Sequence, residues 1–427
     1  MKICTISLHS CPYSRLGGNG SGGMSVYLKE LTSALVDFPH VAIDIFTRAQ
    51  SPVCIEAKDV SPQIRVIQLK GGPQHPIDRK DLYEFVPEFS GNLLDFLMRH
   101  KEECDVVHSH YWLSGLAGGY IKQKLGLPLV HTYHTLGFMK RRALGQKEHR
   151  CRAQSEQHLA HISDVLISPS KEEEKNLVSE YGISSSKVKV VYPGVNRRLF
   201  YPVRIQSIRQ KIGCKKDDFV LLYVGRIEPV KGLITVIRSL EMIGEINQEL
   251  LERTKLLVIG GGKREKEFAS NDEATQIIDL VNQGRLSDSV IFLGSIDQPQ
   301  LKNYYSAADA LIVPSLYESF GLVTVEALAC GTPVIVSQVG KMRTIVKEGE
   351  NGFTFRPNDP ASLSQCLLHF FSHKNQLWSQ ESIREDIIQR FSWEKTAEET
   401  YHILARLIEK SLRPTTIFQP DESLQQV

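Results

Sequence analysis

Long apolar runs, paired cysteines and an excess of one charge are all missing from this sequence of 427 residues. No run of about 18 apolar residues is present, so neither a membrane-spanning helix nor a secretion signal is expected. The eight cysteines are scattered without a C-x-x-C pair, which predicts reduced thiols in a cytoplasmic protein and argues against a disulfide framework or a zinc site. The 51 basic and 49 acidic residues give a net charge of +2, which argues against nucleic-acid binding through bulk charge.

The sequence does contain a repeated alternation of short β-branched runs with longer amphipathic segments, which is typical of parallel α/β sheets. Strands are predicted in two series, at 2–7, 42–47, 64–69, 105–110, 128–134, 164–170 and 187–193, and then at 219–225, 255–261, 290–295, 310–315 and 333–337. The predicted fold class is therefore α/β, with two doubly wound Rossmann-like domains that face each other across a cleft.

The break between the two series sets the predicted domain boundaries. We expect an N-terminal domain over 1–195, a C-terminal domain over 196–390, a helix over 391–413 that packs back toward the N-terminal domain, and a polar tail over 414–427. Ligands of doubly wound domains bind beyond the carboxyl ends of the strands, so a site is expected between the two domains.

Two carboxylates mark the segment "LYESFGLVTVEALACGTPV" (316–334). Glu318 precedes a helix that should begin near Leu322, and Glu326 lies about one turn inside that helix. Because a predicted strand comes just before, both carboxylates can face one ligand at the strand's carboxyl end. The alternative is that Glu318 only interacts with the helix dipole and Glu326 is a solvated surface residue. This segment alone does not separate the two interpretations.

Two cations follow another predicted strand, in "YVGRIEPVKG" (223–232). Arg226 and Lys231 leave the turn beside a helix N-terminus and form a local anion trap in a nearly neutral protein. Solvated loop charges are the alternative. The binding interpretation is favoured because "IGGGK" (259–263) and the helix after Glu318 lie at neighbouring strand ends and point at the same rim.

A glycine-rich loop, "LGGNGSGGMSVYLKEL" (16–31), formally matches G-x-G-x-x-G at Gly18, Gly20 and Gly23. A dinucleotide site is disfavoured, because ten residues separate the first strand from Gly18 and Asp44 falls in the middle of a predicted strand. A loop that ends in two glycines at a helix start better suits close approach to a phosphate or a sugar. A plain mobile loop is the alternative.

Histidines gather at two predicted strand tips of the first half. His110 and Tyr111 end one strand, and His134 and Thr135 end the next, while the alternation in "HTYH" predicts that His131 is buried. Metal binding is disfavoured, because no carboxylate and histidine set with helical i, i+4 spacing accompanies them. The basic residues between 140 and 152 could grip a phosphate, although most of them fit a solvated face.

Six segments together carry a resemblance to a known family. They are "ISLHSCP", "GGMSVY", "DVVHSHYWLSG", "HTYHTLG", "GRIEPVKG" and "ESFGLVTVEALACGTPVI". The sequence resembles the retaining nucleotide-sugar glycosyltransferases of family 4, which have the two-domain GT-B fold, from its first strand to at least residue 360. Within that family it is most similar to the inositol-phosphate N-acetylglucosaminyltransferases of mycothiol synthesis, and next to the sucrose-phosphate synthases.

The resemblance implies roles on the donor side of the cleft. Arg226 and Lys231 would bind the donor diphosphate, and Glu326 would bind the ribose hydroxyls. Glu318 would bind the donor sugar and His134 would lie near the anomeric carbon, so that His134, Arg226, Lys231 and Glu318 form the implied catalytic set. Further donor contacts are implied for Gly22, Gly23, Gly225, Gly261, Ile296, Phe320, Gly321 and Leu322.

The resemblance also implies an acceptor site in the N-terminal domain. The implied acceptor-binding residues are His9, Met24, Ser25, Lys80, Tyr111, Thr135 and Arg152. One of them departs from the pattern, because Ser25 stands where the inositol-phosphate enzymes have an asparagine, in "GGMNVY". This departure leaves the identity of the acceptor open.

Departure of a diphosphate from a sugar develops negative charge, which enzymes meet with a metal held by carboxylates or with fixed cations. No aspartate here has another two positions away, so a D-x-D metal site is missing, and Arg226 with Lys231 should act without metal or other cofactor. In retaining members no side chain is well placed as a nucleophile. The leaving phosphate is therefore expected to help deprotonate the incoming hydroxyl.

The predicted protein is an enzyme, a hexosyltransferase that moves a hexose or N-acetylhexosamine from a nucleotide-sugar such as a UDP-sugar to a hydroxyl acceptor. The predicted acceptor is a small phosphorylated polyol or sugar, such as inositol phosphate. The alternatives are a transferase like sucrose-phosphate synthase with a different acceptor, and a non-transferring epimerase or binding protein. A homodimer is one option, and the sequence leaves the oligomeric state open.

Overall fold

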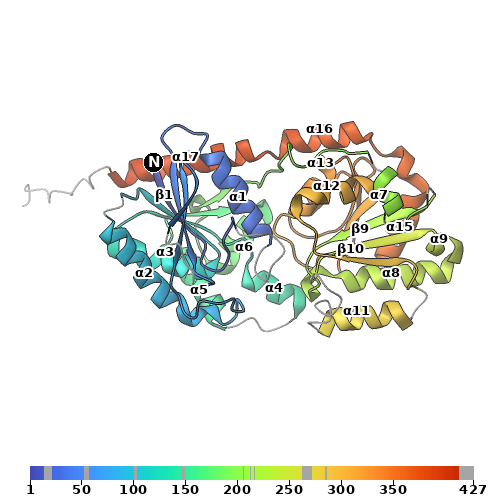
Figure 1. The fold of residues 1–427 in the computed structure, drawn as a ribbon, viewed down its shortest axis with the longest axis horizontal. Helices are drawn as coiled ribbons and strands as arrows, with labels where there is room; N and C mark the ends of the chain where they lie inside the picture. Colours follow the sequence, from blue (N-terminus) through green and yellow to red (C-terminus); the bar gives the residue numbers. More distant parts are fainter. Residues whose placement is uncertain are drawn as a thin grey trace, which may run out of the picture.

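The computed structural model describes residues 1–13, 22–51, 57–100, 103–145, 150–204, 206–211, 213–215, 217–261, 272–283 and 286–412. These residues form two α/β domains that lie side by side (Figure 1). The first domain holds an eight-stranded sheet in the order β3-β4-β2-β1-β5-β6-β7-β8, in which β3 alone of the described strands is antiparallel to its neighbour. Its strands are β1 (Lys2–Ile6), β2 (Ala42–Arg48), β3 (Ala57–Ser61), β4 (Ile64–Leu69), β5 (Val106–His110), β6 (Leu129–Thr132), β7 (Val165–Ser168) and β8 (Val188–Val190).

Helices cover this sheet and connect its parallel strands. They are α1 (Gly23–Leu35), α2 (Val86–Arg99), α3 (Trp112–Leu125), α4 (Gly137–Leu144), α5 (Arg150–Ile162) and α6 (Lys171–Tyr181), with short 3₁₀ turns η1 (Leu82–Phe85) and η2 (Ser185–Lys187). Each of α3, α4 and α6 begins just after a strand ends, which places its N-terminus at the carboxyl edge of the sheet, where the cleft opens.

The second domain holds a six-stranded parallel sheet in the order β11-β10-β9-β12-β13-β14. Its strands are β9 (Phe219–Val224), β10 (Thr254–Ile259), β11 (Val290–Gly294), β12 (Ala310–Val313), β13 (Val334–Ser337) and β14 (Gly352–Phe355). Its helices are α7 (Gln206–Lys211), η3 (Pro229–Lys231), α8 (Leu233–Ile246), α9 (Gln248–Glu252), α11 (Asp272–Gln283), α12 (Gln298–Ala307), α13 (Leu322–Ala329), α14 (Met342–Ile345), α15 (Pro360–His373), η4 (Lys374–Gln376) and α16 (Gln380–Arg390). Every residue of β12 and β13 is buried, because helices pack on both faces of the sheet, and this explains their unbroken apolar sequences.

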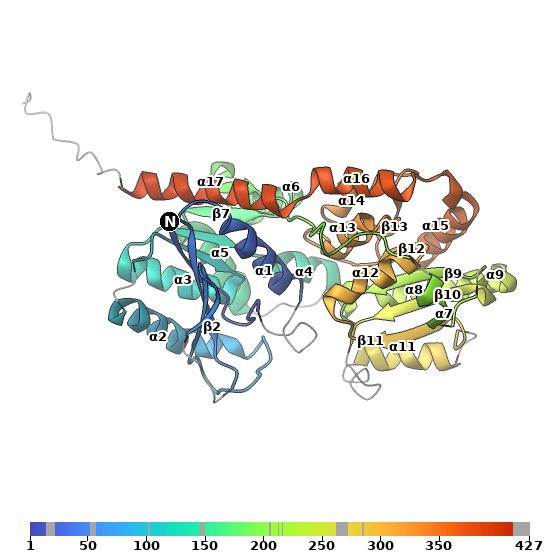
Figure 2. The ribbon, with the colours of Figure 1, turned by 45° about the horizontal axis from the view of Figure 1, so that its top comes forward.

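The last helix joins the two domains. After α16, the chain enters α17 (Trp393–Leu412), which packs against α1 of the first domain, so that α16 and α17 lie along one side of both domains (Figure 2). Tyr401 stacks on Phe38 with ring centroids 4.5 Å apart, and Trp393 meets the ring of Tyr27 edge-on at 5.5 Å. In the described part of the chain, no helix is both long and apolar enough to cross a membrane. The predicted polar tail, 414–427, lies outside the described residues.

The predicted fold class is confirmed, and the differences are local. The sequence prediction omits β3, which is exposed at the sheet edge apart from its last residue, and β14, which has four residues. Several predicted strands run too far at their carboxyl ends, and the physical reason is clear for two of them. β6 ends at Thr132, two residues before the left-handed His134, and β8 ends at Val190, before Pro193. Among the described residues no strand lies between β8 and β9, and the predicted domain division at residue 195 falls within that interval.

Candidate active site

A lysine and a glutamate from two loops meet at the carboxyl edge of the second sheet. Lys231 ends η3, and Glu318 lies between β12 and α13. Lys231 Nζ donates to Glu318 Oε2 at 2.5 Å, with side chains 24% and 19% exposed. Gly232, at φ 69°, allows the two loops to touch, because a Cβ there would lie 2.2 Å from the Pro314 carbonyl oxygen. The pair is thus fixed in place and still reachable from solvent.

The second predicted cation, Arg226, stands just after β9. Its Nη1 donates to Glu228 Oε1 at 2.6 Å, and the Tyr223 hydroxyl donates to the Arg226 carbonyl at 2.8 Å, which fixes the turn. Burial lowers the pKa of Arg226, although a guanidinium remains charged. Both predicted diphosphate ligands are therefore cations paired with a carboxylate.

The neighbouring strand ends approach this turn through glycine. A Cβ on Gly260 would lie 1.7 Å from the carbonyl oxygen of Gly225, so β9 and β10 end in close backbone contact. Gly261, at φ 76°, accepts a hydrogen bond from Ser295 Oγ at 2.5 Å. Ile296 follows and packs, partly buried, on the core of the second domain. The last residues of the "IGGGK" segment, 262 and 263, lie outside the described residues.

Glu326 is buried on α13, so its interpretation as a solvated surface residue is wrong. The Tyr305 hydroxyl donates to Glu326 Oε2 at 2.8 Å, and the Gln298 amide donates to Oε1 at 3.4 Å. Burial raises the pKa of Glu326 to about 7. A buried carboxylate with a raised pKa at a cleft edge is a common feature of functional sites.

The start of α13 faces the start of α1 across the cleft. Gly321 precedes α13 at φ 90°, and the neighbouring Phe320 is buried, with its ring edge-on to Phe391. A Cβ on Gly23, the first residue of α1, would lie 3.6 Å from the Leu322 side chain. Gly23, one of the glycines predicted to approach the donor, therefore lies directly opposite α13, the helix that holds Glu326 and follows Glu318.

Three other positions of the glycine-rich loop differ in their surroundings. A Cβ on Gly22 would meet no atom within 4 Å, whereas Met24 is partly buried against the core of the first domain. Ser25 is fully buried, and its Oγ lies 2.5 Å from Ser10 Oγ. The part of the loop that contains Gly18 and Gly20 lies outside the described residues.

Four histidines cluster at the tips of β5 and β6. His131 is buried as predicted and lies 2.8 Å from Ser109 Oγ, while His110 Nδ1 lies 3.0 Å from His134 Nε2. Burial lowers the pKa of His134 to about 3, and that of His108 and His131 to about 3 as well, so these rings are neutral at pH 7. A neutral His134 can exchange hydrogen bonds with a sugar hydroxyl and carries no charge to the site.

Metal-ligating side chains do not converge here or elsewhere in the described parts of the chain, where no group of three His, Cys, Asp or Glu could hold an ion. The dinucleotide interpretation also lacks its acidic residue, because Asp44 is buried in β2 and its two oxygens accept from Arg65 at 2.7 and 2.6 Å. Independence from metal remains a prediction.

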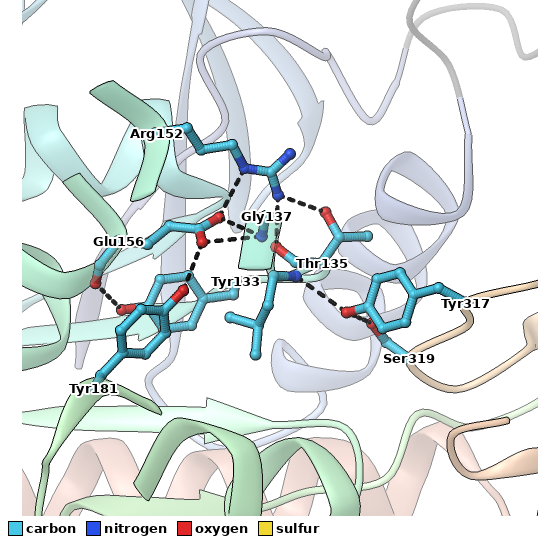
Figure 3. Close-up of polar contacts among 9 residues, drawn as sticks. Tyr133, Thr135, Gly137, Arg152, Glu156, Tyr181, Tyr317 and Ser319 are labelled. Carbon is cyan, nitrogen blue, oxygen red and sulfur yellow. Dashed lines mark hydrogen bonds and ion pairs between the residues drawn. The ribbon is translucent and has the colours of Figure 1, made fainter. Parts of the chain in front are cut away.

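Three of the predicted acceptor residues, Tyr111, Thr135 and Arg152, come together around a buried ion pair. Arg152, Thr135 and the partner carboxylate of Glu156 are drawn in Figure 3. Arg152 Nε donates to Glu156 Oε1 at 2.8 Å, with side chains 7% and 0% exposed. Arg152 Nη2 donates to the Thr135 carbonyl at 3.0 Å and to its hydroxyl at 3.2 Å, and the guanidinium lies 5.2 Å from the centre of the Tyr111 ring. Glu156 also accepts from the Gly137 amide at 2.9 Å. Arg152 is thus held firmly by its own domain.

His9 and Lys80, two further acceptor candidates, differ in placement. The His9 ring lies 4.7 Å from the Tyr111 ring, and its pKa is lowered to about 3, first by burial and then by nearby cations that include Arg79, Arg152 and Arg226. Lys80 has a side chain 71% exposed, with Nζ 3.9 Å from Asp78, and the described structure shows no contact between it and Tyr111 or Arg152. Three arginines therefore lie near enough to His9 to act on its charge.

Sequence reasoning missed several residues of this site. Arg79 stands beside the predicted Lys80, and Glu156 lies one helical turn after Arg152. Both could have been found from their closeness in the sequence to those predicted residues. Tyr317 and Ser319 flank Glu318 and contact the first domain, with Ser319 Oγ 2.9 Å from the His134 carbonyl oxygen. Nothing in the sequence indicated that contact, because it joins residues 185 positions apart.

Comparison with known proteins agrees with this geometry. Residues 21–199 match the family model for glycosyltransferase family 4, and residues 204–390 match the model for glycosyl transferases group 1. The chain therefore belongs to the glycosyltransferases that these two models describe, and the predicted enzyme class is confirmed.

Individual relatives show which glycosyltransferases this chain is similar to in sequence and in structure. A D-inositol 3-phosphate glycosyltransferase 2 of Catenulispora acidiphila is 33% identical over 412 residues, which cover 96% of this chain and 95% of the relative. Among solved structures, sucrose-phosphate synthase of Thermosynechococcus elongatus is 30% identical with a TM-score of 0.86, covering 96% of this chain and 99% of that one. HepE of Anabaena, solved with UDP and glucose, is 19% identical with a TM-score of 0.71 and covers 95% and 99%, which shows the shared fold alone.

Proposed function

We propose that this glycosyltransferase moves a hexose or N-acetylhexosamine from a UDP-sugar to a hydroxyl of a small phosphorylated polyol or sugar, with retention at the anomeric carbon. The observation that carries the proposal is the Lys231–Glu318 pair, which stands at the edge of the cleft beside Arg226. Lys231 and Arg226 can turn from their carboxylate partners to the diphosphate of a donor, because both ion pairs are partly exposed. Glu318 is then free to accept hydrogen bonds from the sugar.

The chemistry of the transfer follows from these charges. Negative charge grows on the leaving diphosphate as the sugar bond breaks, and fixed cations stabilise that charge more in the transition state than in the ground state. His134 is neutral and buried, so it suits a hydrogen bond to a sugar hydroxyl better than proton transfer. The leaving phosphate takes the proton of the incoming hydroxyl, and no metal ion takes part.

A phosphorylated acceptor fits the three arginines that lie near His9. Arg152 lies there with the Tyr111 ring and Thr135, and relatives at 33% identity are named D-inositol 3-phosphate glycosyltransferases. Inositol phosphate is therefore the first acceptor that we propose. A cytoplasmic location is a prediction that rests on the sequence, which leaves the oligomeric state open.

A second candidate is the formation of sucrose phosphate, in which the acceptor would be a fructose phosphate. Two observations favour it: the structural likeness to sucrose-phosphate synthase over 96% of the chain, and the buried Ser25 in place of the asparagine of the inositol-phosphate enzymes. Both candidates use a UDP-sugar and a phosphorylated acceptor, and they differ in the sugar that is transferred and in the acceptor that the N-terminal domain selects.

The test is a product search by mass spectrometry with four substrate pairs. UDP-N-acetylglucosamine and UDP-glucose are each incubated with inositol 3-phosphate and with fructose 6-phosphate, and Lys231→Ala serves as the control with strongly lowered activity. We expect one pair to give an acceptor phosphate that carries the transferred sugar on one of its hydroxyls. The NMR spectrum of this product should show that the α-configuration of the donor is kept. An isomerised nucleotide-sugar without transfer would favour an epimerase, and unchanged substrates in all four pairs would contradict the proposal.

A further inference from the structure

Two hydroxyls of the second domain hold a short segment of the first. Ser319 Oγ donates to the His134 carbonyl oxygen at 2.9 Å, and the Leu136 amide donates to the Tyr317 hydroxyl oxygen at 3.0 Å. The two hydroxyl oxygens are 3.0 Å apart. We refer to His134, Leu136, Tyr317 and Ser319 as the clasp; Tyr317 and Ser319 appear beside the segment in Figure 3.

The direction of these hydrogen bonds is fixed by counting hydrogens. A serine hydroxyl has one hydrogen, and that of Ser319 goes to the His134 carbonyl, so Tyr317 must donate to Ser319. The bonds therefore run in one direction, from the Leu136 amide through Tyr317 and Ser319 to the His134 carbonyl. A chain of this kind strengthens each of its members, and removal of one hydroxyl weakens the whole chain.

The clasp holds a backbone conformation that would otherwise be disfavoured. His134 has φ 63°, in the left-handed region that residues with a Cβ rarely adopt. Such a conformation persists only where the surroundings enforce it, and it concentrates at functional sites. Here the clasp bonds the carbonyl of His134 itself and the amide two residues later.

The same segment is fixed from the opposite side by its own domain. Arg152 donates to the Thr135 carbonyl, and Glu156 accepts from the Gly137 amide, through the buried ion pair described above. The first domain thus holds residues 135 and 137, and the second domain holds residues 134 and 136. Only the second set of bonds can break when the domains separate.

The clasp residues also flank Glu318, which pairs with Lys231. We propose that Tyr317 and Ser319 are positioning residues for sugar transfer, because their clasp sets His134 against Glu318 when the two domains close. Domain opening breaks the clasp and releases the His134 backbone. This inference rests on the proposed function, since it assigns Tyr317 and Ser319 to the geometry of the same site.

Steady-state kinetics of Ser319→Ala, Tyr317→Phe and the double variant test the inference. We expect each single change to lower kcat about 10- to 100-fold, because a displacement of about 1 Å suffices for such a loss. The double variant should lose no more than the worse single variant, because the two hydroxyls form one chain. Binding of UDP and the thermal midpoint should stay near those of the unchanged enzyme. Ser319→Thr, which keeps the hydroxyl, should recover most of kcat.

Tyr201→Phe is the matched control, because Tyr201 lies on the surface and bonds Lys302. It should leave kcat unchanged. Wild-type kcat in both Ser319→Ala and Tyr317→Phe would overturn the proposal. Losses that add in the double variant together with a lowered thermal midpoint would also overturn it, because they would show a merely structural contact.

Hydrogen exchange separates this inference from the proposed function. In Tyr317→Phe the Leu136 amide loses its acceptor and should exchange faster, whereas the Gly137 amide, bound by Glu156, should not. If the unchanged enzyme transfers no sugar, the proposed function fails, and this exchange measurement still decides whether the clasp exists in solution. Equal exchange of Leu136 in the two proteins would show that the clasp does not form.

Discussion

The two faces of the cleft hold their charges in different ways. On the proposed donor face, Arg226 and Lys231 stand on loops after strands and pair with Glu228 and Glu318, and the side chains of these two pairs are between 19% and 47% exposed. On the proposed acceptor face, Arg152 and Glu156 form a pair that is 7% and 0% exposed, and that pair is bonded to the backbone of Thr135 and Gly137.

This difference decides which face can respond to a ligand. An exposed ion pair contributes little to stability, so its members can exchange partners when a diphosphate arrives. A buried pair cannot, because separation leaves a charge without solvent or partner. We infer that the donor face rearranges on binding and that the acceptor face is set when the protein folds.

The largest effect is expected when the buried pair is broken. Glu156→Gln removes the charge that balances Arg152, and loss of one partner of a buried pair destabilises a protein by about 3–5 kcal/mol. Glu228→Gln is the matched control on the donor face, where an exposed pair contributes about 0–1 kcal/mol. Denaturant unfolding of both variants measures the difference. Similar losses of unfolding free energy in the two variants would remove the contrast between the faces.

Loss of a donor-face cation should instead appear in the rate. Lys231→Ala removes a group that meets growing negative charge, and loss of one such group typically lowers kcat by about 10²–10³. The unfolding free energy should hardly change. Steady-state kinetics at varied concentrations of the donor measure kcat and the donor KM of the variant. Unchanged turnover with only a raised donor KM would limit Lys231 to ground-state binding.

Lys80→Ala tests whether the acceptor face also has an exposed member. Loss of a charge-assisted contact of about 1.5–3 kcal/mol would lower kcat/KM for a phosphorylated acceptor about 10- to 150-fold. Transfer to the dephosphorylated analogue should be unaffected. Lys58→Ala, on the exposed strand β3, is the control. Equal effects on both acceptors would remove Lys80 from the acceptor site.

Glu173, at the junction of the two faces, should make stability depend on pH. It is 4% exposed and lines a cavity of about 420 Å³ behind the 316–319 loop, where the hydroxyls of Tyr317 and Ser319 lie near its carboxylate without a hydrogen bond of good geometry. Burial raises its pKa to about 7, so the folded state binds the proton more tightly than the unfolded chain. The contribution of Glu173 to stability is therefore most favourable below about pH 4.5 and is lost as the pH rises through 7.

Glu173→Gln should remove this dependence. We expect the variant to be more stable than the unchanged protein by about 1–3 kcal/mol at pH 8 and equal to it near pH 4.5. Thermal unfolding at both pH values measures the effect, with the exposed Glu180→Gln as control. A variant that is less stable at pH 8 would show that the ionised carboxylate has a partner.

Chelation is expected to have the smallest effect. We propose that Arg226 and Lys231 supply the positive charge that a metal ion would otherwise bring, so transfer should continue at the same rate after EDTA treatment. The product assay with and without EDTA measures this. Activity that disappears on chelation and returns with magnesium or manganese would contradict the proposal that Arg226 and Lys231 stabilise the leaving diphosphate without a metal ion.

Local sequence predicted the strands and the residues at their ends. Buried parallel strands read as apolar runs, so β9, β12 and β13 were recognisable, and the residues that follow a strand must lie at the carboxyl edge of the sheet. β3 was missed because an exposed edge strand has no apolar pattern, and β14 because it has only four residues.

The sequence by itself determined the fold class, the family and the donor-face motif, because each depends on residues a few positions apart. Only the tertiary structure decided how those residues are paired. It buried Glu326 under Tyr305, joined Lys231 to Glu318, and placed Ser319 on the His134 carbonyl. These contacts join residues between 21 and 185 positions apart, and their formation depends on how the sheets and the two domains pack, which no local pattern encodes.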